Sequence, residues 1–396
     1  MNALLLFVAT VAAFALAFMD GANNAANSIG VAIGGGLMGL REALVLAAVF
    51  DLVGGLLYGG FSSPTLFKGV VNPVGMGSNV LATGMTVVLL SSALVVYAAT
   101  RAKIPVSVTQ CVVGSLVGLG LALGGRRVAW DTVAALAVAW SAVPAASTAL
   151  AFVEYRLMEE ATRRLGEPGH LLAGSALAGA TVAMASYFAL TGIPAIGWAL
   201  ALALSVGASA AVAAAFHSYA RKWSGGERYR LYRLLLAFSS ASIALAHGGN
   251  DVANPSGPLA GVIYAEAYGA MGSERVEVPL PIIALSSLGI AAGVLTWGYS
   301  VVETVGERIV ALTPESAFVA QFSASQVVLT TVRLGLPTSI TGAVVGSVAG
   351  VGLARGTRNV NAKVLARIAA TWAASIVAGM ALSFAAIKAY LALSLP

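Results

Sequence analysis

The chain has 396 residues, of which 59% are hydrophobic and only 10% are charged. A soluble domain carries about 25% charged residues, so the composition excludes an ordinary soluble protein. One cysteine excludes an intrachain disulfide and a cysteine-based metal cluster. The net charge of +6 collects between apolar segments, which favours basic loops beside a membrane over nucleic-acid binding.

Twelve apolar segments follow one another along the chain. A bilayer core needs about 20 apolar residues per helix and offers the backbone no water to bond, so these segments predict membrane helices. The sequence therefore predicts an all-α, multi-pass protein of the cell membrane. The segments lie near 4–40, 43–60, 80–99, 105–123, 130–153, 171–190, 194–215, 231–263, 281–302, 317–331, 336–354 and 368–392.

Two motifs recur in the same order at nearly the same spacing. DGANNAANS at 20–28 aligns with HGGNDVANP at 247–255, and PVSVTQCVVGSLVG at 105–118 aligns with PTSITGAVVGSVAG at 337–350. The copies begin an odd number of segments apart, which predicts two repeats of opposite orientation. Inverted repeats around a site at the membrane midplane are typical of secondary transporters.

These repeats suggest three parts of the chain. We expect an N-terminal inverted repeat over 1–153, connecting helices with a basic cytoplasmic loop over 154–230, and a C-terminal inverted repeat over 231–396. With the N-terminus outside, most Lys and Arg residues would lie in the inner loops, in agreement with the positive-inside rule.

Two polar stripes lie near the middles of the first and eighth segments. Their spacing of i, i+3, i+4 and i+7 places four side chains on one helix face. An aspartate at this depth costs at least ~2.5 kcal/mol and needs a partner. Carboxylate and amide oxygens suit sodium or accept protons, whereas zinc would need more His or Cys. The stripes are Asp20, Asn23, Asn24 and Asn27, and His247, Asn250, Asp251 and Asn254.

Helix-breaking residues accompany both stripes. Pro255 and Pro258 lack a backbone N–H and predict an interruption in the eighth segment. Glycines at 21 and 34–36 suggest a similar interruption in the first segment. A broken helix within a membrane exposes carbonyls to cations and N–H groups to anions.

The second motif reads Pro-x-Ser-x-Thr at the start of an apolar run. Proline favours the first helical turn, so Ser107, Thr109, Ser339 and Thr341 would lie beside free backbone N–H groups. Such an N-terminus binds phosphate-like anions, although Ser and Thr also cap helices for structural reasons. To bring these residues to the midplane, we expect a re-entrant hairpin in each repeat, at 80–123 and 317–354.

These residues resemble the inorganic phosphate transporter (PiT) family over nearly the whole chain. GGNDVANPSGP at 248–258 is similar to that family's duplicated GANDVAN-like signature. PVSVTQ at 105–110 and PTSITG at 337–342 are similar to its P-V-S-T-T-H-like element. The chain departs from the signature at Asn24, where the family has aspartate and where Asp20 is the nearest charge.

The resemblance implies symport of inorganic phosphate with sodium, without an organic cofactor. Proton coupling and another oxyanion such as sulfate remain open, as does the oligomeric state. An intramembrane enzyme is disfavoured by the three histidines and one cysteine, and a channel would not saturate. For phosphate we expect Ser107, Thr109, Gln110, Thr338, Ser339, Thr341, Asp20 and Asp251. For sodium we expect Asp20, Asn23, Asn24, Asn27, Asn250, Asp251 and Asn254.

Overall fold

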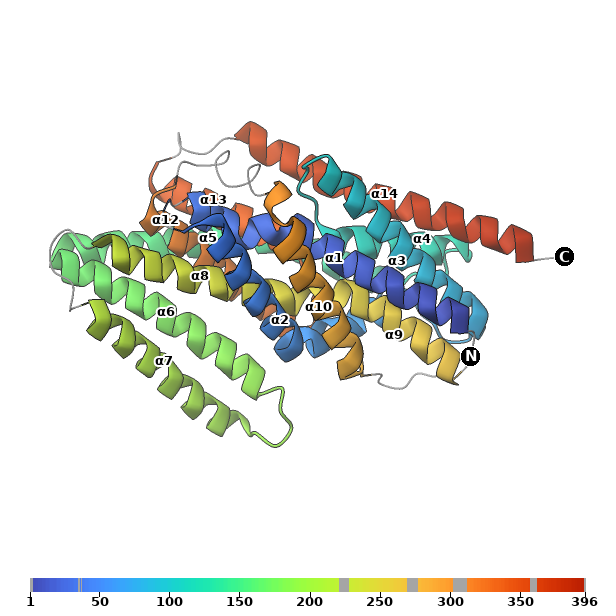
Figure 1. Cartoon of the computed structure of the whole chain (residues 1–396), viewed down its shortest axis with the longest axis horizontal. Helices are drawn as coiled ribbons and strands as arrows, with labels where there is room; N and C mark the ends of the chain where they lie inside the picture. Colours follow the sequence, from blue (N-terminus) through green and yellow to red (C-terminus); the bar gives the residue numbers. More distant parts are fainter. Residues whose placement is uncertain are drawn as a thin grey trace.

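The computed structural model describes residues 3–34, 36, 38–220, 228–268, 277–301, 312–356 and 362–394, and the described part is a bundle of α-helices (Figure 1). Every predicted apolar segment contains a helix, which confirms the all-α prediction. The helices are α1 (Ala3–Gly34), α2 (Leu40–Pro64), α3 (Ser78–Arg101), α4 (Val108–Ala122), α5 (Trp130–Leu165), α6 (Glu167–Leu190), α7 (Trp198–Ala220), α8 (Arg228–Asp251), α9 (Ala253–Tyr268), α10 (Leu280–Trp297), α12 (Pro314–Arg333), α13 (Ile340–Ala354) and α14 (Ala362–Ser394). A short π-helix, η1 (Thr65–Gly69), follows α2.

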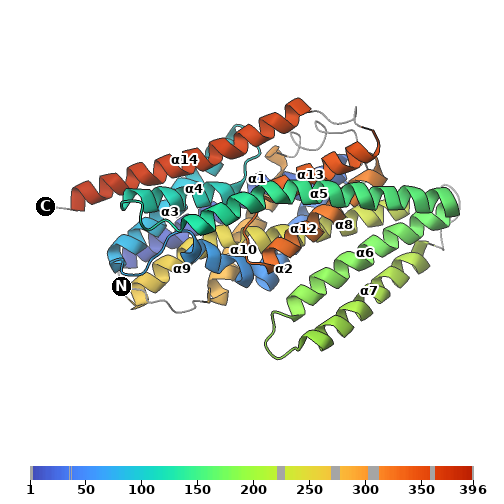
Figure 2. The same cartoon turned by 180° about the vertical axis from the view of Figure 1, so that it is seen from behind.

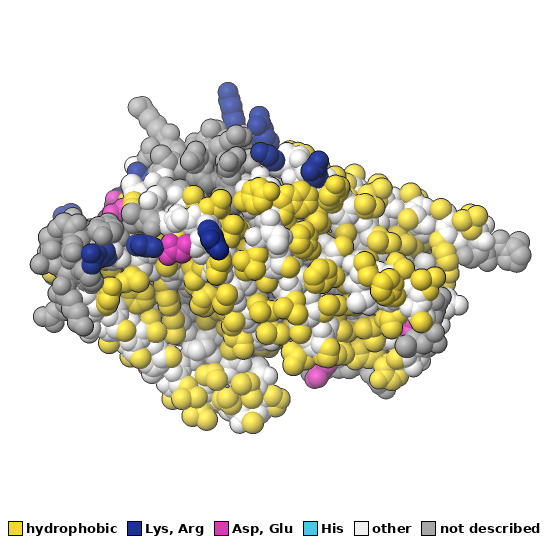
Figure 3. All heavy atoms as spheres, in the orientation of Figure 1, with side chains coloured by type: hydrophobic (Ala, Val, Ile, Leu, Met, Phe, Trp, Pro, Cys, Tyr) yellow, Lys and Arg dark blue, Asp and Glu magenta, His cyan; other side chains and the backbone are white. Residues whose placement is uncertain are grey.

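The outer surface of the bundle matches a lipid environment. Nine helical stretches among the described residues are long and apolar enough to cross a membrane. Hydrophobic side chains cover most of the face in Figure 3, while Lys and Arg gather along its upper left edge. On this face the described basic residues therefore gather at one edge of the apolar surface, as the positive-inside rule predicts for a multi-pass membrane protein.

The two repeats pack crosswise against each other. Helix α4 of the first repeat lies along α14 of the second, and α13 of the second lies along α5 of the first. Glycine permits both contacts: a Cβ added at Gly114 would lie 2.3 Å from the carbonyl oxygen of Ile376. Its counterpart Gly346 has the same 2.3 Å separation from the carbonyl oxygen of Pro144. The repeats therefore exchange equivalent contacts.

Two helical hairpins enter the bundle from opposite ends. Figures 1 and 2 place α3 and α4 toward the end that holds both termini, and α12 and α13 toward the other end. Helices α4 and α13 have 15 residues each and span only about 22 Å, too short to cross a bilayer core of about 30 Å. The hairpin tips, 102–107 and 334–339, each begin at an exposed residue and end at the buried residues Ser107 and Ser339. These features match the predicted re-entrant hairpins.

The structure contains one of the two predicted helix interruptions. Helix α8 ends at Asp251 and α9 begins at Ala253, so the eighth segment is broken within its polar stripe. Helix α1 is continuous from Ala3 to Gly34, which corrects the prediction of a break in the first repeat. The physical reason is that the stretch 247–258 contains Pro255 and Pro258, each of which removes a helical hydrogen bond, whereas the equivalent stretch of α1 contains no proline.

Candidate functional site

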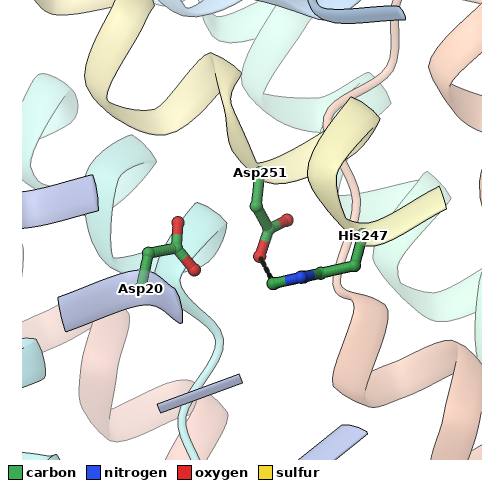
Figure 4. Close-up of side chains that lie close together, drawn as sticks. All are labelled: Asp20, His247 and Asp251. Carbon is green, nitrogen blue, oxygen red and sulfur yellow. Dashed lines mark ion pairs between the residues drawn. The ribbon is translucent and has the colours of Figure 1, made fainter. Parts of the chain in front are cut away.

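The two polar stripes face each other in the interior of the bundle. Asn24 Nδ2 donates to Asp20 Oδ1 and to Asp251 Oδ2, both at 2.8 Å, and so bridges the two carboxylates. Asn254 Nδ2 donates to Asp20 Oδ2 at 2.8 Å. Both aspartates are at most 1% exposed. Figure 4 shows Asp20 on α1 and Asp251 on α8 pointing toward one another. The repeats thus combine their acidic residues in one enclosed cluster.

Equivalent asparagines hold the two hairpin tips. Asn23 Oδ1 accepts from the N–H of Val106 at 3.0 Å, and its Nδ2 donates to the carbonyl of Ile104 at 3.1 Å. Asn250 Oδ1 accepts from the N–H of Thr338 at 3.0 Å, and its Nδ2 donates to the carbonyl of the same residue at 2.8 Å. Each asparagine side chain thus bonds backbone N–H and C=O groups of a hairpin tip, which lies outside the helices and cannot form helical hydrogen bonds. The signature motifs therefore position the hairpins.

The hairpin helices begin directly beside the stripes. Ser107 caps α4 by accepting from the backbone N–H three residues ahead at 3.4 Å, and Ser339 caps α13 in the same way at 3.2 Å. Thr341 Oγ1 accepts from Asn27 Nδ2 at 2.9 Å and joins α13 to α1. Ser107, Ser339, Thr341 and Thr109 are all buried. The positive ends of two helix dipoles are thereby directed at the interior.

Several buried polar atoms among these residues have no hydrogen-bond partner. They include Oδ1 of Asn27 and of Asn254, which occupy equivalent positions in the two stripes. Gln110 Oε1 and Thr338 Oγ1 are also unpartnered. Leaving such an atom buried costs about 1–3 kcal/mol, which a ligand would recover. Two amide oxygens suit a hard cation, and a threonine hydroxyl can donate to an anion.

A buried histidine joins a third acidic residue to the cluster. His247 Nδ1 lies 2.8 Å from Oδ1 of Asp51 on α2, and its Nε2 lies 3.2 Å from Asp251 Oδ2. One ligand atom each from Asp20, His247 and Asp251 lies within 4.8 Å of the others. Both imidazole nitrogens lie beside carboxylates, so neither is left free to bind a metal. The arrangement therefore favours an interaction of His247 with Asp51 and Asp251 over a transition-metal site.

Sequence reasoning missed Asp51. A usable signal was present, since Asp51 is the single charged residue within the apolar segment 43–60. An ionisable residue inside a membrane segment is costly and marks a functional site by default. The sequence did not reveal the partner of Asp51, because its contact with His247 depends on how α2 packs on α8. The remaining predicted site residues all lie at this centre or at the two hairpin tips.

This architecture defines a class of protein. Crossed repeats, re-entrant hairpins and a polar centre enclosed within an apolar bundle are the features of a secondary membrane transporter. The sequence model of the phosphate transporter family matches residues 20–383, and the chain belongs to that family. The resemblance drawn from the four motif copies is confirmed.

Known proteins support this assignment over the whole length. A protein of Pyrococcus furiosus, provisionally named a phosphate permease, is 33% identical over 95% of each chain. The chloroplastic inorganic phosphate transporter 2-1 of Arabidopsis thaliana is 32% identical over 96% of this chain and 71% of its own length. A solved sodium-dependent phosphate transporter superposes with a TM-score of 0.93 and 29% identity, covering 99% of this chain and 100% of its own.

Proposed function

We propose that the protein imports inorganic phosphate by symport with sodium. One observation carries the proposal: two carboxylates, two unpartnered amide oxygens and two hairpin helix N-termini meet in one buried region between the repeats. Cation ligands and anion donors are thus close enough to influence each other's occupancy. The sodium dependence named for the solved relative agrees with this assignment.

The phosphate would bind between the N-termini of α4 and α13. Ser107, Thr109, Ser339 and Thr341 lie in or beside the first turns of these helices, where backbone N–H groups and the dipole favour an anion. Thr338 Oγ1 is an unpartnered hydroxyl at the second hairpin tip. Gln110 in the first turn of α4 would add a side-chain amide.

The acidic residues would favour phosphate over sulfate. Phosphate keeps a proton near neutral pH and can donate it to a carboxylate, whereas sulfate has no such proton. Asp20 and Asp251 supply the acceptors in this scheme. A carboxylate near fully deprotonated sulfate would leave two acceptors facing each other without a shared hydrogen, which is unfavourable in a buried site.

Sodium would bind between the stripes. Asn27 Oδ1 and Asn254 Oδ1 would each pair with the carboxylates of Asp20 and Asp251, and oxygen ligands of this kind suit a hard cation. The remaining stripe residues, Asn23, Asn24 and Asn250, would hold these groups in position through the hydrogen bonds already described. Bound sodium would offset the repulsion between carboxylates and phosphate, which is strong at low dielectric.

Proton coupling is the second candidate function. The bridge that Asn24 makes between two buried carboxylates brings like charges together, and a proton on either one would relieve that repulsion as sodium does. Both candidates use the same residues and differ in the coupling ion.

Uptake into proteoliposomes tests the proposal. We expect labelled phosphate to accumulate when an inward sodium gradient is imposed, and to remain near background with a proton gradient in choline. Excess sulfate should leave the uptake unchanged. Accumulation driven equally by a proton gradient without sodium would transfer the coupling to protons, and competition by sulfate would contradict the assigned selectivity.

A further inference from the structure

A groove lies on the outer surface of α2. It has a volume of about 850 Å³ and runs along the first turns of α2 to Ala237 of α8. Val45 and Val49 line it and are 49% and 52% exposed. On the surface of a membrane protein such side chains meet lipid. The shape and polarity of the groove suit an acyl chain.

The charged residues at the mouth of the groove are not equivalent. Glu42 accepts two hydrogen bonds from Arg233, at 3.0 and 2.9 Å, so its charge is neutralised. Arg41 is exposed and lines the same groove, and no hydrogen bond or ion pair joins it to another group in the described part of the chain. Among the described residues, the mouth of the groove therefore carries an unbalanced positive charge.

The start of α2 adds backbone donors beside this charge. Helix α2 begins at Leu40 after Gly39, which has no side chain to cap the first turn. The first N–H groups of a helix have no partner within the helix, and together with the dipole they favour a phosphate group. The cationic side chain of Arg41, the uncapped N–H groups and the apolar groove therefore follow one another along α2.

We propose that this groove binds an anionic phospholipid of the surrounding bilayer. The headgroup phosphate lies at the first turn of α2 beside Arg41, and one acyl chain runs down the groove over Val45 and Val49. The loop before α2 lies on the side where we expect the basic residues, and anionic lipids attract basic groups there. The lipid would bind at a surface distinct from the buried transport site.

Native mass spectrometry of the full chain in detergent tests the proposal, with phosphatidylglycerol and phosphatidylcholine of identical acyl chains as probes. We expect phosphatidylglycerol to bind more tightly. Arg41→Gln should weaken its binding about fivefold and abolish the preference. Ala237→Phe should weaken both lipids by filling the groove. The control Arg156→Gln removes an exposed arginine of α5 paired with Glu159, and should bind as the wild type does.

Three results would overturn the proposal. They are equal binding of both lipids by the wild type, a preserved preference in Arg41→Gln, and displacement of the lipid by inorganic phosphate alone, which would make this a site for the free anion. Melting temperatures in detergent are compared first to show that each variant is folded. If Ala237→Phe does not fold, Val49→Phe fills the same groove from α2 and should weaken both lipids.

Discussion

Single side-chain atoms would set the ion preference of the proposed site. The Nδ2 of Asn254 donates a hydrogen bond to Asp20, whereas its Oδ1 has no partner and is the proposed sodium ligand. We expect Asn254→Ala to raise the half-saturating sodium concentration at least about tenfold, since a contact to a charged group contributes about 1.5–3 kcal/mol. Sodium-dependent phosphate uptake measures this. Asn79→Ala, at an exposed position of α3, is the matched control.

Asp51 is a residue whose role the structure alone reveals. Its hydrogen bond to His247 is fully buried, so Asp51→Asn removes one partner of an enclosed pair and should destabilise the protein by about 3 kcal/mol or more. The double variant Asp51→Asn with His247→Gln should recover part of the loss. A double-mutant cycle on melting temperatures would show the coupling, and strictly additive effects would contradict it.

Helices in this protein approach each other through glycine. At Gly346 of α13 a Cβ would lie 2.3 Å from the carbonyl oxygen of Pro144, so Gly346→Ala should separate α13 from α5 and lower the melting temperature. Gly207 of α7 has open space around it, and Gly207→Ala should instead stabilise by up to about 1 kcal/mol through helix propensity. Thermal unfolding in detergent compares the two, and equal shifts would refute the packing argument.

Element breaks were predictable only where a residue forces them. Pro255 and Pro258 made the interruption between α8 and α9 predictable from the sequence, because the loss of a backbone N–H weakens the helix locally. The glycines of the first motif suggested the same in α1 and were misleading. Glycine merely permits a break, and Gly21 instead lies against the backbone of α10, where an added Cβ would be 2.0 Å from the carbonyl oxygen of Ile290.

The whole molecule depends on its internal duplication. Because two motifs recur in order, the hairpins and the meeting of the stripes could be predicted from sequence. Two features could not be predicted: the packing of α4 and α13 against helices of the opposite repeat, and the contact of Asp51 with His247. Both follow from tertiary packing that no local pattern specifies. Asn24, where the chain departs from the family signature, donates a hydrogen bond to Asp20, the charge nearest to it in the sequence.

Reciprocal binding tests the central claim most directly. If cations and phosphate share the buried cluster, each must raise the affinity of the other by the same factor. Calorimetric titration of phosphate into the purified protein, in sodium and in choline at equal ionic strength, measures that factor. We predict markedly tighter phosphate binding in sodium, and loss of the difference in Asp251→Asn. Equal phosphate affinity in both salts would contradict the account.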